Sequence, residues 1–412
     1  ARDYFWLVGP PGTGKTSRAL RRMVETFHGE GKQILLLSYT NRAVDEICKM
    51  LVSIAPAVDF IRVGSELSCE VPYRPYLMEN VLDSCANRRA VQERIARCRI
   101  FVGTVATLSS RTELFRLKTF DVALIDEATQ ILEPQLLGLL CMRSVSGGNA
   151  IGKFIMIGDH KQLPAVILQS SEQSEVCDEA LQAIGLYNLK DSLFERLYRN
   201  CTATVHRSYD MLCRQGRMHP EVALFANRAF YGGRLIPVGL PHQIESSDTI
   251  CRLAFYPSVP EKAGASAKIN YSEARIVADL AARIYEDHQT DFDESRTLGI
   301  ITPYRSQIAL IKKEIESLGI PALNRILVDT VERFQGSERD VIIYSFCVNY
   351  PYQLKFLSNL TEEEGVLIDR KLNVALTRAR KQMFITGVPE LLERNPLYKS
   401  LLKLIESLRN IA

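Results

Sequence analysis

Short apolar runs rich in branched residues alternate with longer amphipathic stretches along most of the chain. An uninterrupted short run bounded by turn residues is typical of a buried strand, and an amphipathic stretch of helical period is typical of a helix packed on a sheet. Such runs occupy Phe5–Val8, Ile34–Leu37, Ile100–Val102, Val122–Ile125 and Phe154–Ile157, and a second series occupies Leu253–Tyr256, Leu298–Ile301, Ile326–Val328, Val341–Phe346 and Phe384–Thr386. Strands that alternate with helices predict parallel β-α-β units, so we expect two α/β domains.

The change from one series to the other predicts the domain boundary. It falls after the helical stretch Asp191–Tyr198 and before the polar segment His206–Gln215. We therefore predict that domain 1 spans residues 1–204 and that domain 2 spans residues 205–412.

Residues 65–99 interrupt the alternation within the first domain. Pro72 and Pro75 precede a helical stretch, Asn87–Arg97, that carries several arginines. This pattern predicts a small helical insertion. Its arginines either guide a polyanion toward the protein or form an ordinary solvated face of a helix.

The composition of the chain excludes several classes of protein. The chain has 412 residues, with 51 Lys plus Arg against 48 Asp plus Glu and a formal net charge of +3. This balance excludes a protein that binds polyanions by bulk attraction, so any contact with nucleic acid must be local. No apolar run approaches the ~20 residues that span a bilayer, and the first residues lack a signal-peptide pattern, so we expect no membrane association. The chain has no initiator methionine, and we expect it to be part of a longer protein with further domains fused upstream.

Ten cysteines lie far apart, and no Cys-x-x-Cys pair suggests zinc binding or redox chemistry. We expect buried thiols in a reducing compartment. The expected location is therefore intracellular: cytoplasmic, or nuclear in a eukaryote. The sequence does not indicate the oligomeric state.

A phosphate-binding loop follows the first predicted strand. The pattern G-x-x-x-x-G-K-[ST] is matched by Gly9, Pro10, Pro11, Gly12, Thr13, Gly14, Lys15 and Thr16. Glycines in such a loop let successive backbone N–H groups point toward one anion, and the lysine adds a cation for the β- and γ-phosphates. The Thr16 hydroxyl is a candidate ligand for Mg²⁺.

Two carboxylates follow the strand Val122–Ile125, which we expect to be a neighbour of the first strand. Asp126 is placed to hold Mg²⁺, and Glu127 is the candidate base that orients and deprotonates the attacking water. Alone, the pair would equally suit a helix N-cap, but beside a phosphate-binding loop the catalytic interpretation is favoured. After the strand Phe154–Ile157, Gln162 either senses the γ-phosphate or belongs to a polar turn.

These three motifs and three later segments resemble the ordered motifs of superfamily 1 helicases, in the branch with senataxin, aquarius and the nonsense-mediated-decay helicase. The segments are Gly9–Thr16, Asp126–Gln130, Gly158–Pro164, Arg217–Pro220, Thr330–Glu338 and Asn373–Arg380. The resemblance implies two tandem RecA-like P-loop domains with parallel sheets, an ATP-binding cleft between them, and ATP and Mg²⁺ as cofactors.

By position, Arg217 and Arg378 resemble the two family arginines that reach the γ-phosphate from the second domain. A guanidinium in that role stabilises the charge of the transition state. Glu338 resembles the carboxylate that binds the ribose hydroxyls, and Gly336 belongs to the turn that carries it. An ordinary surface residue remains the alternative for each charged position.

The resemblance also implies a track for single-stranded DNA or RNA. Its residues would be small polar groups and backbone amides, namely Ser38, Thr40, Asn41, Gly103, Thr104, Thr302, Pro303, Tyr304 and Thr330. Such groups suit contact with phosphate and sugar without readout of bases. Helix caps and turns are the alternative role for these residues.

Two departures from the family pattern bear on base recognition. Only eight residues precede Gly9, so the upstream glutamine motif that reads adenine is expected to be absent from this chain, and Gly216 stands where relatives have an adenine-stacking tyrosine. We predict an ATP-dependent helicase or translocase that moves 5′ to 3′. An ATP-gated nucleic-acid clamp that does not separate strands is the first alternative, and a P-loop signalling ATPase or kinase is the second.

Overall fold

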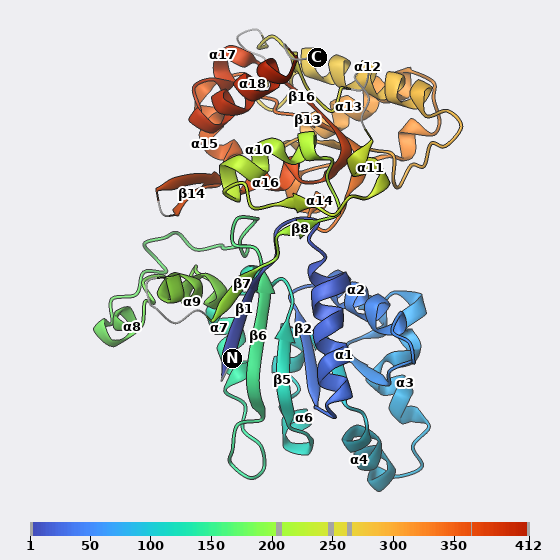
Figure 1. Cartoon of the computed structure of the whole chain (residues 1–412), viewed down its shortest axis with the longest axis vertical. Coiled ribbons are helices and arrows are strands. Elements are labelled where there is room, and N and C mark those ends of the chain that lie inside the picture. The colour runs from blue at the N-terminus through green and yellow to red at the C-terminus, as the bar shows by residue number, and fades with distance from the viewer. Residues whose placement is uncertain (1–2, 203–207, 246–250, 262–265, 364, 410–412) are drawn as a thin grey trace. The chain divides into compact units, whose positions relative to one another are not determined.

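The computed structural model describes residues 3–202, 208–245, 251–261, 266–363 and 365–409. The chain divides into two compact units (Figure 1). Unit 1 comprises Ala1–His160 and Pro164–Leu212, and unit 2 comprises Lys161–Leu163 and Cys213–Ala412. The predicted boundary between residues 204 and 205 lies in the segment 203–207, outside the described residues.

Unit 1 is built on a seven-stranded sheet with the strand order β3-β4-β2-β5-β6-β1-β7, and every neighbouring pair is parallel. The strands are β1 (Tyr4–Val8), β2 (Ile34–Ser38), β3 (Phe60–Val63), β4 (Ile100–Thr104), β5 (Phe120–Ile125), β6 (Ile151–Gly158) and β7 (Tyr209–Met211). In β2, Leu35 and Leu37 join one core cluster, whereas Ile34 and Leu36 join another. Since side chains alternate across a strand, an uninterrupted apolar run is what a sheet covered on both faces requires.

The helices of unit 1 cover the two faces of this sheet. Those on the Ile34 face are α1 (Arg21–Gly29) and α2 (Asn41–Val52), which contribute Val24 and Val44 to that cluster. Those on the Leu35 face are α5 (Val105–Ser109), α6 (Thr112–Leu117), α7 (Glu133–Leu140) and α9 (Leu193–Thr202). The remaining helical segments are the π-helix η1 (Lys15–Leu20), η2 (Glu66–Ser68), η3 (Val71–Tyr76), α3 (Met78–Asp83), α4 (Arg88–Arg97), η4 (Ala128–Gln130) and α8 (Glu179–Ala183).

Unit 2 has a five-stranded parallel sheet with the order β10-β16-β13-β11-β12. Its strands are β10 (Leu253–Pro257), β11 (Leu298–Ile301), β12 (Leu327–Asp329), β13 (Arg339–Ser345) and β16 (Ala379–Gly387). Two short pairs accompany it, the parallel β8 (Arg214–Gln215) and β9 (Ile236–Pro237), and the antiparallel β14 (Leu360–Glu363) and β15 (Val366–Asp369).

One face of the second sheet packs on α12 (Tyr271–Asp287) and α13 (Arg305–Ser317). The other helical segments are α10 (Pro220–Phe230), α11 (Pro241–Ile244), η5 (Leu323–Arg325), α14 (Val331–Phe334), η6 (Pro351–Gln353), α15 (Leu354–Leu357), α16 (Arg370–Leu376), α17 (Pro389–Leu392) and α18 (Pro396–Arg409). The predicted fold class, α/β with parallel sheets in two tandem units, is confirmed.

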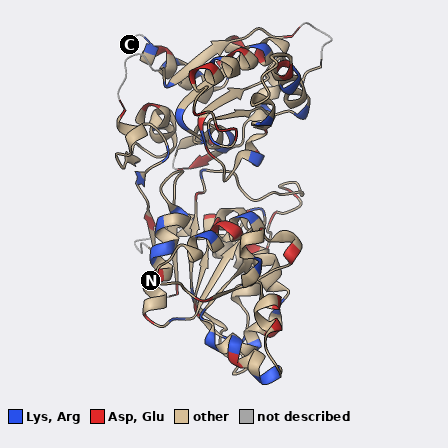
Figure 2. Ribbon diagram, turned by 90° about the vertical axis from the view of Figure 1, so that its right-hand side faces the viewer, with Lys and Arg blue, Asp and Glu red and all other residues tan. Residues whose placement is uncertain are grey.

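The segment between β3 and β4 contains the stretch interpreted as an insertion. It holds η2, η3 and α3, followed by α4, which begins where Asn87 Oδ1 accepts the N–H of Ala90 at 3.0 Å. On α4, Arg89 pairs with Glu93, and Arg94 pairs with Asp59 of the loop before β3. Figure 2 shows basic and acidic residues interspersed over both units, including the end of unit 1 that α4 occupies. Two of the arginines of α4 are therefore paired with carboxylates of unit 1.

Among the described residues, no disulfide joins any of the ten cysteines. The expectation of buried thiols is right for Cys48, Cys69, Cys98, Cys201 and Cys347 but wrong for Cys141, Cys177 and Cys251, which are exposed. The exposed cysteines lie in connecting segments between strands and helices, where a pattern of apolar runs says little about burial. Among the described residues, no helix is both long and apolar enough to cross a membrane.

A buried ion pair fastens α9 to α7 in unit 1. Arg196 donates from Nε to Glu133 Oε2 at 2.7 Å and from Nη2 to Glu133 Oε1 at 2.5 Å, and both side chains are less than a tenth exposed. We predict that Glu133→Gln lowers the free energy of unfolding of unit 1 by about 3–5 kcal/mol, because Arg196 would be left as a buried charge without its partner.

Urea unfolding followed by the fluorescence of Trp6 measures this effect, since the chain has one tryptophan and it lies buried in unit 1. Glu93→Gln is the matched control, because its exposed pair with Arg89 contributes little. Equal unfolding midpoints for Glu133→Gln and the parent chain would contradict the prediction.

Candidate nucleotide site

The loop after β1 has the backbone of a phosphate-binding loop. Gly12 and Gly14 have φ values of 72° and 75°, in the left-handed region that favours glycine. The aliphatic part of Lys15 lies over Gly9, where a β-carbon would come within 2.1 Å of Lys15 Cγ. Thr13 donates from both its N–H and its hydroxyl to the Pro10 carbonyl, at 3.3 and 2.7 Å. The glycines are therefore required by the path of the loop and by the position of the lysine.

The helix after this loop begins as a π-helix rather than an α-helix. Both Arg18 and Ala19 donate their N–H groups to the Gly14 carbonyl at 3.0 Å. Single π-turns of this kind are frequent at functional sites. Here the wide turn carries Lys15 and Thr16 at its first two positions.

Asp126 lies at the carboxyl end of β5 and is joined to the loop. Thr16 Oγ1 donates to Asp126 Oδ2 at 2.6 Å, and the Glu127 N–H donates to Asp126 Oδ1 at 3.0 Å. The expectation that this strand is the neighbour of β1 is wrong, because β6 lies between β1 and β5 in the sheet. The carboxyl ends of parallel strands lie along one edge, so Asp126 still reaches Thr16.

Burial is the main cause that raises the pKa of Asp126 to about 6, and the negative charge of Glu127 adds to it. The hydrogen bond from Thr16 and the charge of Lys15 act in the opposite direction. A buried carboxylate with a raised pKa is a candidate for function, because a cation would restore the charged form.

Glu127 occupies a strained position at the same edge. Its φ is 52°, which is uncommon for a residue with a β-carbon. Its carboxylate lies 3.6 Å from Lys15 Nζ and accepts a hydrogen bond from Gln130 Nε2 at 3.3 Å. Gln130 ends the Asp126–Gln130 segment, but the sequence did not suggest that its side chain contacts Glu127. Backbone strain next to a charged cluster is typical of a site where position matters more than local stability.

The segment after β6 divides between the two units. Asp159 and His160 are buried in unit 1, whereas Lys161–Leu163 belongs to unit 2. There Lys161 Nζ donates to the Phe230 carbonyl at 2.7 Å, and Gln162 Oε1 accepts a hydrogen bond from Arg378 Nη2 at 3.2 Å. Gln162 therefore lies beside an arginine of the second unit.

Both arginines that the sequence singled out are engaged within unit 2. Arg378 is buried and donates to the carbonyls of Val374 and Ser337 at 3.1 and 3.4 Å. Arg217 donates from Nε to Glu338 Oε2 at 2.5 Å and from Nη1 to the Thr377 carbonyl at 3.2 Å.

The backbone beside Arg217 is held by Gln215, whose Oε1 accepts the N–H groups of Arg217 and Met218 at 2.9 and 2.8 Å. Gln215 could not be predicted from sequence, because a buried glutamine carries no signal in a polar segment.

Two family models, each described as an AAA domain, match residues 1–87 with 83–170 and residues 189–390. The DNA replication ATP-dependent helicase/nuclease DNA2 of Bos taurus is 27% identical over 448 residues, which covers 99% of this chain and 37% of that protein. The same protein of Gallus gallus is 30% identical over 408 residues, covering 97% and 36%. The Regulator of nonsense transcripts 1 of Dictyostelium discoideum is 30% identical over 450 residues, covering 96% and 30%.

The chain belongs to the superfamily 1 helicases. It spans about a third of the length of the curated relatives that it matches. Among solved structures, Arterivirus nonstructural protein 10, a helicase in complex with DNA, is similar with a TM-score of 0.49 and 14% identity, covering 96% of this chain and 62% of that one.

The residues that the helicase resemblance assigns to nucleic acid differ in exposure. Thr40 and Asn41 are exposed, while Pro303, Tyr304 and Thr330 are half-buried. Ser38, Thr104 and Thr302 are buried, and Gly103 lies so close to the Val63 carbonyl that a β-carbon would be 2.8 Å from its oxygen. Their common feature is a position at or just after the carboxyl end of a strand.

Several of these polar groups have a structural partner. Thr40 Oγ1 accepts the Ala43 N–H at 3.2 Å and Thr104 Oγ1 accepts the Thr107 N–H at 3.1 Å, so both cap helices. Ser38 Oγ donates to the Asp126 carbonyl at 3.3 Å. Capping therefore accounts for the side chains of Thr40 and Thr104.

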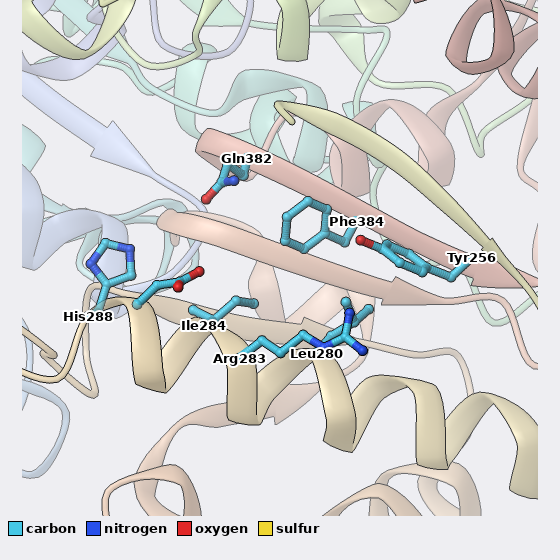
Figure 3. Close-up of a pocket in the computed structure, with 8 residues that line it drawn as sticks. Tyr256, Leu280, Arg283, Ile284, His288, Gln382 and Phe384 are labelled. Atoms are coloured by element: carbon cyan, nitrogen blue, oxygen red, sulfur yellow. The ribbon is translucent and has the colours of Figure 1, made fainter. Parts of the chain in front are cut away.

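A separate pocket lies in unit 2 between α12 and the strands β10 and β16 (Figure 3). It is lined by Tyr256, Leu280, Arg283, Ile284, Asp287, His288, Gln382 and Phe384. None of these residues is among those that the sequence assigned to nucleotide or nucleic-acid binding.

The pKa of Asp126 generates a prediction about stability and pH. The folded protein keeps this proton to about pH 6, whereas the ordinary value is 3.8. Ionisation of Asp126 therefore lowers the free energy of unfolding as the pH rises from the ordinary pKa of 3.8 toward about 6. Above about pH 6 the folded protein bears the whole of this loss of stability. We predict that Asp126→Asn raises the thermal unfolding midpoint at pH 8 and that the gain shrinks toward pH 5.

Differential scanning fluorimetry in EDTA and without nucleotide measures this gain. Asp83→Asn, at an exposed position at the end of α3, is the control and should leave the midpoint unchanged at both pH values. A destabilised Asp126→Asn protein at pH 8 would show that the hydrogen bonds of the carboxylate outweigh its desolvation.

Proposed function

We propose that this chain is the ATP-hydrolysing motor of a superfamily 1 helicase, which uses ATP and Mg²⁺ to move along single-stranded nucleic acid. The observation that carries the proposal is that the phosphate-binding loop contacts the acidic pair. Thr16 Oγ1 donates to Asp126 Oδ2 at 2.6 Å, and Lys15 Nζ lies 3.6 Å from Glu127 Oε1. The relatives named as ATP-dependent helicases support it.

The donors at the edge of the first sheet fit Mg²⁺. The ion prefers oxygen ligands and keeps several waters, so a hydroxyl, one carboxylate and phosphate oxygens suffice. Thr16 and Asp126 supply the first two, and among the described residues no cluster of three or more His, Cys, Asp or Glu could hold a metal by itself. When bound, Mg²⁺ would neutralise phosphate charge, and Glu127 would accept the proton of the attacking water.

The other residues of the proposed site have roles that follow from their chemical groups. The N–H groups of the loop from Gly9 to Gly14 and the Lys15 ammonium bind phosphates, and Glu338 binds the ribose. Gln162 responds to the γ-phosphate, and Arg217 and Arg378 stabilise the charge that develops on it. The strand-end residues from Ser38 to Thr330 named above hold the sugar-phosphate backbone, and we propose movement from 5′ to 3′.

The test is the ATPase rate with single-stranded DNA, with single-stranded RNA and without polymer, followed by unwinding of duplexes with a single 5′ or 3′ tail. We expect stimulation by a single strand and unwinding from the 5′ tail. Stimulation without unwinding would favour an ATP-gated clamp, and equal rates under all three conditions would favour a signalling ATPase.

We predict that Glu127→Gln binds ATP with an unchanged Kd and loses at least about a hundredfold in kcat, because the amide keeps the shape but cannot accept the proton. Lys15→Ala should instead weaken the binding of a non-hydrolysable ATP analogue, since it removes a phosphate cation. Isothermal titration and steady-state kinetics separate the two effects. Turnover of Glu127→Gln within threefold of the parent chain would contradict the role of the glutamate.

We predict poor discrimination among ATP, GTP, CTP and UTP, because Gly216 offers no ring to a base. Aromatic stacking on a base is worth about 1–3 kcal/mol, so Gly216→Tyr should lower the KM for ATP. Gly216 is not in the left-handed region, and a β-carbon would meet only the side chains of Leu240 and Val238, at 3.2 and 3.3 Å. Steady-state kinetics with the four nucleotides measures this, and a preference of ~100-fold for ATP would show that another residue reads the base.

A further inference from the structure

Arg217 and Glu338 form an ion pair within unit 2. The bond from Arg217 Nε to Glu338 Oε2 is 2.5 Å long, and the guanidinium also donates from Nη1 to the Thr377 carbonyl. The Arg217 side chain is 17% exposed and that of Glu338 is 43% exposed, so the carboxylate is the more accessible partner. The arginine that we assign to the γ-phosphate is thus held by the carboxylate that we assign to the ribose.

The backbone at Arg217 is fixed independently of this pair. Its N–H donates to Gln215 Oε1 at 2.9 Å, and its carbonyl oxygen lies 2.8 Å from His242 Nε2. On the other side, Gly336 has a φ of 81°, which lets the chain turn before Glu338. Only the guanidinium can therefore change partner without rearranging the loop.

The charges around Glu338 keep it ionised. Burial alone would raise its pKa, but the charge and hydrogen bond of Arg217, together with the charges of Arg380 and Arg378, bring the pKa below the ordinary value. Arg380 Nε lies 3.8 Å from Glu338 Oε1 and Arg380 Nη1 lies 3.4 Å from Asp340, so Arg380 is shared between two carboxylates. Arg217 is the cation in closest contact with Glu338, and its own charge is largely compensated by it.

An arginine accelerates phosphoryl transfer only through interactions that are stronger in the transition state than before it. The bond between Arg217 and Glu338 opposes this stabilisation of the transition state, because the bond must weaken before the guanidinium can turn to another anion. A ribose hydroxyl that donates to the same carboxylate takes up part of its hydrogen-bonding capacity and weakens its hold on Arg217.

Resting on the function proposed above, we propose that Glu338 is a positioning residue that restrains Arg217 until the ribose hydroxyls of a bound ribonucleoside triphosphate engage it. Contact of Glu338 with the ribose hydroxyls then raises kcat as well as lowering KM. The size of this effect is the same whichever of the four bases the nucleotide carries. The pair makes this ATPase selective for ribonucleotides at the step of hydrolysis.

The experiment compares ATP with 2′,3′-dideoxy-ATP, without polymer, for the parent chain, Glu338→Gln and Glu332→Gln. Glu332 is the matched control, because it lies in the same segment and pairs with Lys371 at 3.2 Å instead of with Arg217. In the parent chain we expect kcat to fall roughly two- to fivefold with the dideoxy nucleotide, the factor that corresponds to a partly exposed ion pair.

For Glu338→Gln we expect a higher KM for ATP, a kcat raised by a similar factor, and equal kcat values for the two nucleotides. Glu332→Gln should behave as the parent chain. A residue that only binds the ribose would change KM alone, and a merely structural one would lower kcat for both nucleotides alike.

Equal kcat values for the two nucleotides in the parent chain would overturn the inference, even if Glu338→Gln did not fold. An unchanged or lower kcat for folded Glu338→Gln with ATP would overturn it as well. A parent chain that hydrolyses no nucleotide would instead refute the proposed function, so the two failures are distinguishable.

Discussion

The hydrogen bond between the Thr16 hydroxyl and the buried carboxylate of Asp126 is the contact on which the proposed chemistry of unit 1 depends. It joins two segments that are far apart in sequence, the turn after β1 and the end of β5. The rest of the sheet serves to bring these two ends together, since β6 pairs with both β1 and β5 and holds them in parallel register. The carboxylate lies where burial disfavours its charge, which is a cost that a bound cation can offset.

The same constraint explains the close packing around this edge. Gly158, at the end of β6, has so little room that a β-carbon would come within 2.9 Å of the Thr129 side chain. Ser38 ends β2 and donates to the Asp126 carbonyl, which fixes the peptide that leads into Glu127. Small residues at the ends of β2 and β6 let the acidic segment lie against the sheet, and the left-handed turn at Glu127 follows from that path.

The parts of the fold that could be predicted from sequence are those set by local periodicity. The uninterrupted runs of β2 and β5 predict strands because both faces of the sheet are covered. β3 could not be predicted, because Arg62 interrupts its apolar run, and the side chain is buried only because Asp45 of α2 and the Ser68 carbonyl receive it. Such a partner is known only once the chain is folded. β7 was missed for a related reason, since a three-residue strand depends on its pairing with β1.

The phosphate-binding loop and the acidic pair were visible in the sequence because each is a contiguous pattern. The pair of Arg217 with Glu338 and that of Arg378 with Gln162 join separate motifs, and no local pattern predicts them.

These contacts share a physical consequence. Every charged group assigned to the phosphates, Lys15 included, has a polar partner within its own unit. Partnered groups avoid the cost of isolated charge in a partly buried site. Such groups favour the proposed reaction only to the extent that a nucleotide offers them a better partner. The strength of these contacts therefore sets how much of the binding energy remains for hydrolysis.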